Sequence, residues 1–336
     1  MYGAGSAYAN ANWVRWMYDD APGAKTRGPA LWTYRSDGAI QGQVGAIRAR
    51  LRVGDREHDF AWSLDLMVSP AFRARGVGAV LPKMVQSSAE LLGGTEVSEA
   101  AQKAFARGGW AHLGTLTRWA RPVRGSFARA RIDSRLSPWL APAVGVAASA
   151  VGVVAGVRAF GRKLVAIEAF DERADHVWKT CAPRWPVVAR RDREWLAWRW
   201  TSCPDRRGAT AFMMTAHGDP HGWVVLRVEE ERGLRAGHVV DLFCAPEDLD
   251  ALLALSVAEL RSRDVDVVYC TLGAPGASKA LAANGFLRRD SGFAMMTFAP
   301  ESAGEDVRAL VANRDAWFVT AGDSDLDRSR EATAYA

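Results

Sequence analysis

The chain repeats parts of its own sequence at a nearly constant separation, and this repetition constrains the fold more than any other feature. The aromatic segment Trp13–Pro22, which reads Trp-x-x-Trp-x-Tyr-x-x-x-Pro, recurs 182 residues later as Trp195–Pro204, with Trp in place of Tyr. The segment Asp65–Pro70 shares its first two residues and its proline with Asp241–Pro246, 176 residues later. The second offset also relates three further pairs: Thr95 and Thr271, Gly109 and Gly285, Trp110 and Phe286. Since 336 residues correspond to about two domains, we interpret the chain as two copies of one unit.

The first copy contains an apolar strand, a loop rich in glycine and arginine, and a helical pattern in direct succession. The strand ends at Pro70, and Gly76 and Gly78 lie where the helix is expected to begin. Glycine has no side chain to keep a ligand away from the backbone, and the first N–H groups and the dipole of a helix attract phosphate oxygens. Arg73 and Arg75 add cationic, fork-shaped donors. The segment therefore predicts a pyrophosphate-binding loop; the alternative is an ordinary strand-to-helix turn with arginines on its surface.

Two familiar phosphate-binding patterns do not fit this loop. A Walker loop requires Gly-x-x-x-x-Gly-Lys-Ser/Thr, and a dinucleotide fingerprint requires a third glycine where Leu81 stands. The pattern that fits is Val-x-Pro-x-x-Arg-x-x-Gly-x-Gly, from Val68 to Gly78. It resembles the acyl-CoA-binding motif of the GNAT superfamily of N-acyltransferases, and with its repeat the chain is similar to a tandem GNAT protein. The resemblance implies an α/β fold, with two domains that each contain a mixed, mostly antiparallel central sheet flanked by helices.

The second copy lacks the features of the pyrophosphate loop. Its corresponding segment, Glu247–Leu253, begins with two acidic residues and contains no glycine. The positions of Arg73, Gly76 and Gly78 are taken by Leu249, Leu252 and Ala254. Acids in the first turn are typical of an ordinary helix start and would repel a pyrophosphate. We therefore expect only the first copy to bind CoA.

These observations divide the chain into four parts. We expect a GNAT domain with an intact acyl-CoA motif at 1–133, an apolar helical connector at 134–163, a degenerate GNAT-like domain at 164–320 and a disordered tail at 321–336. Residues 136–157 carry no charge, which is also typical of a membrane span. Their many small residues and their position between two copies of one fold favour a packed connector; contact with a membrane remains the alternative.

Composition favours a cytoplasmic protein without nucleic-acid partners. The formal net charge is +5, and no dense basic cluster with interleaved aromatic residues occurs. The four cysteines have no Cys-x-x-Cys spacing, which indicates reduced, buried thiols and no metal site. No signal peptide is visible at the N-terminus. The expected partner is a small-molecule amine acceptor, and a homodimer remains open.

The resemblance also implies which residues contact acetyl-CoA or another acyl-CoA. The end of the central strand supplies backbone groups to the pantetheine arm and thioester, the loop binds the pyrophosphate, and a polar residue opening a later helix contacts the cofactor. These residues are Leu66, Met67, Val68, Arg73, Ala74, Arg75, Gly76, Val77, Gly78, Ala79 and Ser98.

The catalytic groups are less well defined, because the chain departs from the family pattern. Phe105 stands where the family has a tyrosine that acts as the general acid. Trp62 stands where the family commonly has a glutamate that acts as the general base. The remaining candidates for the base are Asp65, Glu57, His58 and Glu96. By strict alternation Asp65 points away from the Leu66 and Val68 side, although a bulge would change its face.

The resulting hypothesis is an acyl-CoA-dependent N-acyltransferase, with acetyl as the expected group and a primary amine of a small molecule or amino sugar as acceptor. Aromatic side chains that could contact the acceptor are Trp13, Trp16, Tyr18 and Trp62. Two alternatives remain. One is a catalytically weak or inactive CoA-binding sensor or scaffold. The other is a membrane-associated transferase acting on a lipid-linked or surface glycan.

Overall fold

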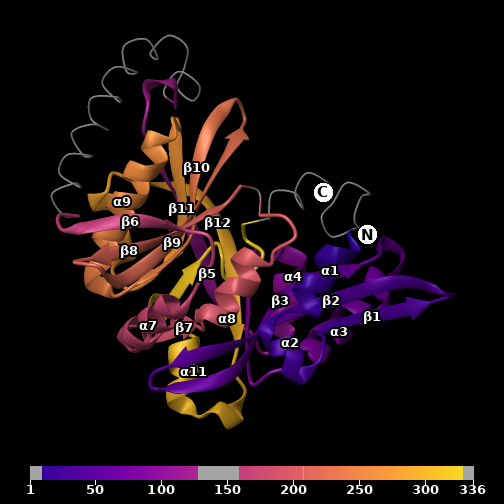
Figure 1. Ribbon diagram of the computed structural model, residues 1–336. Coiled ribbons are helices and arrows are strands. Elements are labelled where there is room, and N and C mark those ends of the chain that lie inside the picture. Colours follow the sequence, from indigo (N-terminus) through magenta and orange to yellow (C-terminus); the bar gives the residue numbers. More distant parts are fainter. Residues whose placement is uncertain (1–9, 128–158, 207, 328–336) are drawn as a thin grey trace. The chain divides into compact units, whose positions relative to one another are not determined.

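The chain forms two compact units, and each is assembled from separate stretches of sequence. The computed structural model describes residues 10–127, 159–206 and 208–327 (Figure 1). Unit 1 comprises Met1–Leu116, Pro186–Asp205 and Phe293–Ala336, and unit 2 comprises Thr117–Trp185 and Arg206–Gly292. The connector predicted around 136–157 lies outside the described residues. Among the described residues, no helix is long and apolar enough to cross a membrane.

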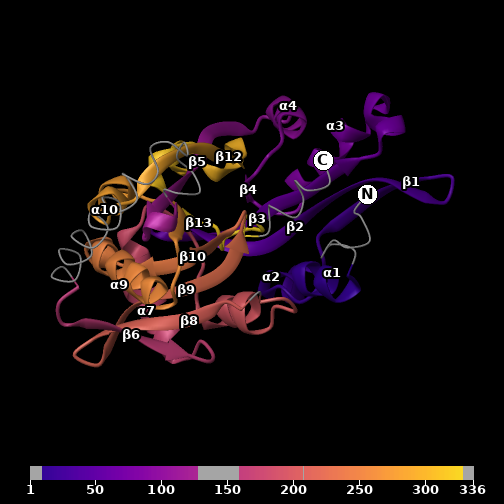
Figure 2. The same cartoon turned by 90° about the horizontal axis from the view of Figure 1, so that it is seen from above.

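Unit 1 is a mixed sheet with helices on both faces. Its strands follow the order β13-β7-β2-β3-β4-β12, with β1 beside β2. Figure 2 shows α3 and α4 on one face of β2 and β3, and α1 and α2 on the opposite face. The helices are α1 (Ala11–Tyr18), α2 (Pro22–Arg27), α3 (Val77–Gln86), α4 (Glu99–Arg107), α8 (Arg193–Leu196) and α11 (Glu305–Val311). The strands are β1 (Leu31–Ser36), β2 (Ala39–Val53), β3 (Arg56–Val68), β4 (Leu91–Gly94), β7 (Val187–Ala189), β13 (Trp317–Thr320) and the end of β12 (Leu287–Phe298).

Unit 2 repeats this arrangement with its own mixed sheet, in the order β5-β11-β10-β9-β8-β6. Its helices are α7 (Glu172–Cys181), α9 (Leu249–Ser262) and α10 (Ala277–Ala283). Its strands are β6 (Arg162–Ile167), β8 (Thr210–Ala216), β9 (Asp219–Glu231), β10 (Leu234–Cys244), β11 (Val267–Gly273) and the end of β5 (Ala111–Pro122). The predicted α/β class with mixed, mostly antiparallel sheets is confirmed. Most of the described strand pairs are antiparallel, and the parallel ones include β3 with β4 and β13 with β7 in unit 1 and β10 with β11 in unit 2.

The two copies exchange their last strands. The strand after α4, β5, pairs with β11 of unit 2 from Arg118 to Pro122. The strand after α10, β12, pairs with β4 of unit 1 from Met296 to Phe298. The compact units therefore do not follow the continuous ranges predicted at 1–133 and 164–320. Local spacing marks where a strand occurs, but its partner depends on pairing across long stretches of sequence.

The start of the predicted disordered tail is packed into unit 1. Asp323 and Asp327 form buried ion pairs with Arg191 and Arg199 of the same unit, and Ser324 accepts a hydrogen bond from Thr95. Buried charges are retained in a folded protein only when they are paired and hydrogen-bonded. The prediction of disorder is thus wrong for 321–327, and residues 328–336 lie outside the described part.

The core of unit 1 fixes the position of the predicted pyrophosphate-binding loop, Val68–Gly78, which we call the phosphate loop. The helix α3 packs on β2 and β3 through buried side chains that include Val77, Leu81 and Val85, against Val44 and Ala61 of the strands. Removing such apolar surface from water contributes roughly 25 cal/mol per Å². The start of α3 is therefore held firmly at the end of β3.

Candidate functional site

The segment from β3 to α3 has the backbone geometry predicted for a phosphate-binding loop. After β3 the chain forms a short 3-10 helix, η2 (Pro70–Arg75), and then α3 begins. Gly76 connects the two in the left-handed conformation, with φ +80°, which favours glycine. A Cβ atom on Gly78 would meet only Val68 Cγ2, at 3.9 Å, so the first turn of α3 is open to a ligand. Helix starts of this kind attract anions.

The two arginines of the loop are exposed and are positioned by local contacts. Arg73 Nε donates to the carbonyl oxygen of Val68 at 3.2 Å. The Arg75 guanidinium lies 4.6 Å from the centre of the Phe72 ring. Within the described part of the chain, neither exposed side chain forms an ion pair with a carboxylate, so both charges are available to a polyanion at the start of α3.

Beside the loop, β3 extends beyond its parallel neighbour β4. The pairing runs from Phe60 with Leu91 to Trp62 with Gly93 and ends there. On the other side, β2 accompanies β3 to Val68. We call the stretch of β3 from Leu64 to Val68, on the side that β4 does not cover, the open edge of β3. A backbone edge of this kind offers N–H and C=O groups to an extended ligand.

The open edge contains a β-bulge at Asp65. Asp65 has φ +56°, and the register between β2 and β3 shifts between Gln43 and Gly45. The carboxylate of Asp65 accepts a hydrogen bond from the Tyr18 hydroxyl of α1. Asp65 is thus directed toward the face of the sheet that carries α1, opposite to the face on which Leu66 and Val68 pack against α3. Relative to Leu66 and Val68, this is the direction that strict alternation predicts.

Two of the four predicted base candidates lie far from the loop. Glu57 and His58 are at the beginning of β3, and ten residues of strand, roughly 33 Å, separate His58 from Val68. Glu57 lies 3.5 Å from an Arg190 nitrogen, and His58 Nδ1 lies 2.8 Å from Glu90 Oε1. At the opposite end of the strand, Glu57 is thus ion-paired and His58 is hydrogen-bonded. Asp65, in the bulge, and Glu96, just after β4 with φ +55°, are the two candidates next to the open edge.

The aromatic residues predicted to contact the acceptor are core residues. Trp13, Trp16, Tyr18 and Trp62 are all buried. Trp16 and Trp198 each donate an indole N–H to the other's carbonyl oxygen, at 2.9 and 2.8 Å, and their rings are stacked at 4.8 Å. The repeated aromatic segments of the two copies therefore pack on each other within unit 1. Burial excludes the predicted stacking of a sugar on Trp16, because neither face of its ring is free.

The helix α4 shows the remaining predicted features. Ser98 is its N-cap, and its hydroxyl accepts from the Ala101 N–H at 3.4 Å. Phe105 is buried against the Trp110 ring, with ring centres 4.4 Å apart. The position that carries an acidic hydroxyl in the resembling family is thus a packing position in this chain.

The corresponding loop of unit 2 is closed by its own side chains. Asp248, at the end of the 3-10 helix η5 (Pro246–Asp248), is buried and accepts two hydrogen bonds from Arg162 at 2.9 and 2.6 Å. His221 Nδ1 lies 3.2 Å from the same carboxylate. Leu249 and Leu252 are buried where the first copy has Arg73 and Gly76. A buried carboxylate at this place opposes the binding of a second pyrophosphate.

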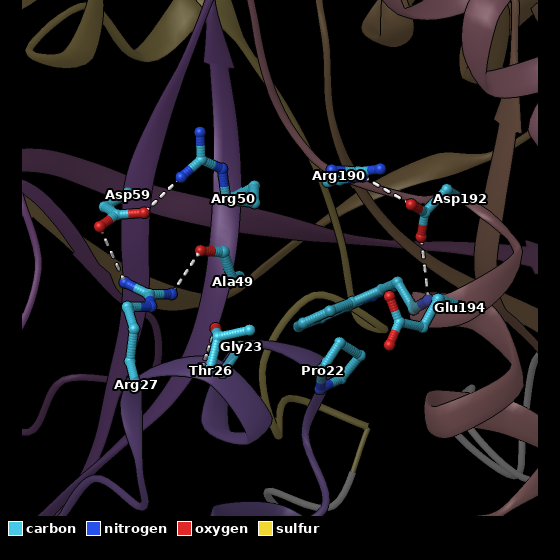
Figure 3. A pocket seen from close by; sticks show the side chains of 11 residues that line it. Pro22, Gly23, Thr26, Arg27, Ala49, Arg50, Asp59, Arg190, Asp192 and Glu194 are labelled. Carbon is cyan, nitrogen blue, oxygen red and sulfur yellow. Dashed lines mark hydrogen bonds and ion pairs between the residues drawn. The ribbon is translucent and has the colours of Figure 1, made fainter.

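A hollow of about 360 Å³ lies in unit 1 between α2, the middle of β2 and the segment before α8 (Figure 3). Its charged side chains form pairs with one another. Arg27 lies 3.6 Å from Asp59, which also pairs with Arg50, and Arg190 donates to Asp192 at 2.6 Å. Asp59 lies in the first half of β3, away from the phosphate loop. With its charges balanced, this hollow selects neither an anion nor a cation.

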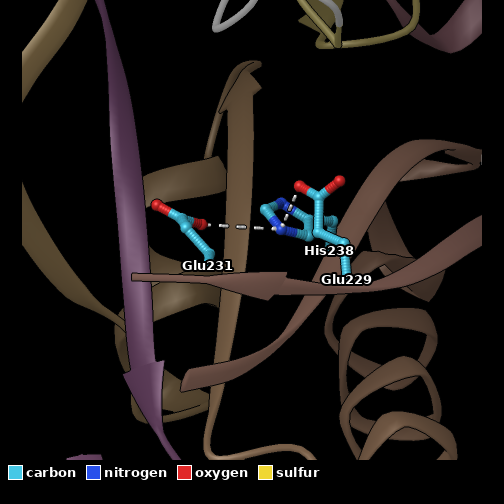
Figure 4. A group of neighbouring side chains, drawn as sticks. All are labelled: Glu229, Glu231 and His238. Carbon is cyan, nitrogen blue, oxygen red and sulfur yellow. Dashed lines mark ion pairs between the residues drawn. The ribbon is translucent and has the colours of Figure 1, made fainter. Parts of the chain in front are cut away.

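A second polar group lies in unit 2, where Glu229, Glu231 and His238 converge (Figure 4). His238 Nε2 is 3.0 Å from Glu229 and 3.8 Å from Glu231. Burial lowers the pKa of His238, an effect that the hydrogen bond to Glu229 opposes. Arg118 lies 3.2 Å from Glu231, and Arg227 lies 3.5 Å from Glu229. Because each carboxylate already has an arginine, we interpret this group as an ion-pair network within the sheet.

All four cysteines are buried, as predicted, and none of them forms a disulfide with another described residue. Burial raises the pKa of the Cys270 thiol to about 12, and it raises the pKa values of Cys181 and Cys244 as well. Thiols in this state are poor nucleophiles and poor metal ligands.

Comparison with known proteins identifies the fold. The sequence matches no protein-family model and no curated protein. The structure is similar to a GCN5-related N-acetyltransferase from Anabaena variabilis, with 12% identity, coverage of 82% of this chain and 64% of that chain, and a TM-score of 0.55. It is similar to a GCN5-related N-acetyltransferase from Kribbella flavida, with 14% identity, 87% and 64% coverage and a TM-score of 0.54. It is also similar to Saccharomyces cerevisiae N-myristoyltransferase with bound myristoyl-CoA, with 11% identity, 83% and 74% coverage and a TM-score of 0.51.

These likenesses place the chain in a structural class. It has the mixed α/β fold of GCN5-related N-acetyltransferases and N-myristoyltransferases, that is, of the GNAT superfamily. The arrangement of two repeated units is consistent with the fold of the myristoyltransferase, so the tandem GNAT architecture predicted from the sequence is confirmed. The chain spans just under two thirds of the length of the two acetyltransferase structures.

Proposed function

We propose that the protein is an acyl-CoA-dependent N-acyltransferase whose cofactor site lies in unit 1. The observation that carries this proposal is that three features follow one another along the chain. They are the bulge at Asp65, the open edge of β3 up to Val68, and the glycine-containing start of α3. Together they offer backbone groups and positive charge along a path that fits an extended molecule ending in a pyrophosphate. Unit 2, whose corresponding loop is filled by Asp248 and Arg162, serves as a structural partner.

In this proposal the loop binds the phosphates and the strand binds the pantetheine arm. The N–H groups of Gly76 and Gly78 and the side chains of Arg73 and Arg75 neutralise the pyrophosphate. The backbone of Leu66–Val68 pairs with the amides of the arm, and the bulge presents donors where charge develops on the thioester oxygen. These groups orient the thioester toward the α1 face of the sheet, where Asp65 lies.

Asp65 is the base that we propose for the acceptor amine. An amine must lose a proton before or during attack on the thioester carbonyl. The carboxylate of Asp65 is oriented by the hydrogen bond that it accepts from the Tyr18 hydroxyl. Glu96, two residues after the end of β4, is the alternative. The thiolate of CoA can leave without an acid, because the pKa of an unperturbed thiol is roughly 8.5, so Phe105 does not prevent turnover.

The acceptor that we propose is a primary amine of a small molecule or amino sugar, and the transferred group is acetyl. The carboxylate of Asp65 favours a cationic amine approaching from the α1 face, where Tyr18 lies. Four buried cysteines that form no disulfide in the described part of the chain support the further proposal of a cytoplasmic location.

Thermal unfolding with increasing acetyl-CoA tests the cofactor site. A ligand at 100 times its dissociation constant stabilises the native state by about 2.7 kcal/mol. We expect this shift for the wild type and its loss in an Arg73→Glu/Gly78→Trp double variant. The exposed charge reversal Lys103→Glu on α4 is the matched control and should keep the shift. Absence of a shift in the wild type would remove the basis of the proposal.

A second candidate function is a CoA-binding sensor or scaffold without turnover. It is favoured by one observation, the apolar packing of Phe105 at the position of the family's acid. Release of free CoA from acetyl-CoA in the presence of a panel of primary amines distinguishes the two functions. Binding without amine-dependent release would support the sensor and contradict the enzyme.

A further inference from the structure

We propose that Trp62 sets the length of the acyl chain and restricts the site to acetyl and similarly short groups. This inference rests on the proposed function, and it concerns which acyl-CoA the same site accepts. It is carried by the position of Trp62 on β3 and by what its ring contacts.

Trp62 lies where the open edge of β3 ends. Its pairing with Gly93 is the last register pair between β3 and β4, and the two strands separate shortly after it. The phosphate loop begins at the other end of this edge, after Val68. An extended cofactor anchored at the loop and aligned along the edge therefore runs toward Trp62. Only three residues of strand, roughly 10 Å, separate Trp62 from the bulge at Asp65.

The indole of Trp62 occupies the space over the backbone of β4. A Cβ atom on Gly93 would lie 2.6 Å from Cζ3 and 2.8 Å from Cε3 of Trp62, so the ring is in direct contact with this glycine. Because backbone flanks the ring at this point, the ring cannot be displaced toward β4 to admit a longer chain.

Aromatic residues of unit 1 hold the indole in place. The Phe60 ring meets it edge-on, with centres 4.8 Å apart, and the Trp317 ring lies 6.0 Å away. All three side chains are fully or almost fully buried. Interiors packed in this way do not open a new cavity without a large cost. The end of the open edge is thus a rigid aromatic wall.

The test compares binding of four probes by calorimetry: CoA, acetyl-CoA, butanoyl-CoA and octanoyl-CoA. We expect the wild type to bind octanoyl-CoA at least tenfold more weakly than acetyl-CoA. The variant Trp62→Leu creates apolar space, and each methylene that enters such space increases the affinity about fourfold. This variant should therefore bind octanoyl-CoA more tightly than acetyl-CoA.

Two further variants control for the loss of a buried tryptophan. Trp223→Leu removes a fully buried indole from unit 2; like that of Trp62, its N–H has no hydrogen-bond partner in the described structure. This variant should keep the wild-type order of affinities. Trp62→Phe keeps an aromatic ring and creates a smaller cavity, and it should fold and show an intermediate preference even where Trp62→Leu does not fold.

The outcomes separate this inference from the proposed function. If CoA itself does not bind the wild type, the proposed function fails, and the inference fails with it. If CoA binds but octanoyl-CoA binds as tightly as acetyl-CoA, only the inference is overturned. It is equally overturned if folded Trp62→Phe and Trp62→Leu variants retain the wild-type order.

Discussion

The hydroxyl of Tyr18 donates a hydrogen bond to the carboxylate of Asp65 across Gly45, a residue with no room for a side chain. Tyr18 is the last residue of α1, and Asp65 is the bulged residue of β3, so the contact joins a helix on one face of the sheet to the open edge of its central strand. The counterpart of Asp65 in the second copy, Asp241, is buried and accepts a hydrogen bond from the neighbouring Leu242 N–H.

Replacing Asp65 with Asn is expected to reduce turnover by roughly 10²-fold, because a proton acceptor is lost. Tyr18→Phe should reduce kcat by roughly tenfold with little change in KM for acyl-CoA, because it removes only the group that orients the carboxylate. Steady-state kinetics with an amine that supports turnover measures both. Glu57→Gln, at the far end of β3, is the control and should retain activity. Equal kinetics for Asp65→Asn and wild type would assign the proton transfer to another group.

Gly45→Ala is expected to destabilise unit 1. A Cβ atom at this position would lie 2.3 Å from the Tyr18 hydroxyl oxygen, so the ring or the strand must move. Overpacking of this kind costs about 1–3 kcal/mol. Urea unfolding measures the cost. Gly78→Ala is the matched control, since its Cβ would meet only Val68 Cγ2 at 3.9 Å. Unchanged stability of Gly45→Ala would show that the Tyr18 ring does not need the space over Gly45.

Asp327→Asn should destabilise the protein strongly. Asp327 pairs with Arg199, and both side chains are at most 2% exposed. Breaking a buried pair leaves an uncompensated charge and costs about 3–5 kcal/mol. The control is Glu247→Gln, which breaks an ion pair with the half-exposed Arg184. This variant should lower the free energy of unfolding by less than about 1 kcal/mol. Similar denaturation midpoints for the two variants would contradict the role of the 321–327 segment in the fold.

Stability should fall as the pH is lowered below 6.5, in part because of His238. Burial lowers the pKa of this residue below its ordinary value of 6.5, so the unfolded state takes up a proton before the folded state does. The resulting loss is at most about 1.4 kcal/mol per pH unit for one proton. Chemical denaturation at pH ~7.5 and ~5.5 measures it. His238→Gln should show a smaller difference between the two pH values, and an unchanged difference would exclude His238 as a source.

The sequence predicted the features that depend on local spacing. The repeat at 176 and 182 residues indicated two copies of one unit, and Val68 to Gly78 indicated a strand, a glycine-containing turn and a helix. The loss of glycine in Glu247–Leu253 indicated a closed second loop, in which the structure places a buried Asp248. These predictions succeed because turn chemistry, helix starts and periodicity are set by neighbouring residues.

Tertiary structure decided what depends on partners distant in sequence. The exchange of β5 and β12, the mutual indole hydrogen bonds of Trp16 and Trp198, and the packing of 321–327 each join segments more than 100 residues apart. The bulge at Asp65 leaves no pattern in the sequence. The amino-acid sequence by itself therefore determined the class of fold and the place of the glycine-containing turn between β3 and α3. Only the pairing of strands and the packing of side chains decided that Asp65 contacts Tyr18 and that the Trp62 ring packs on Gly93.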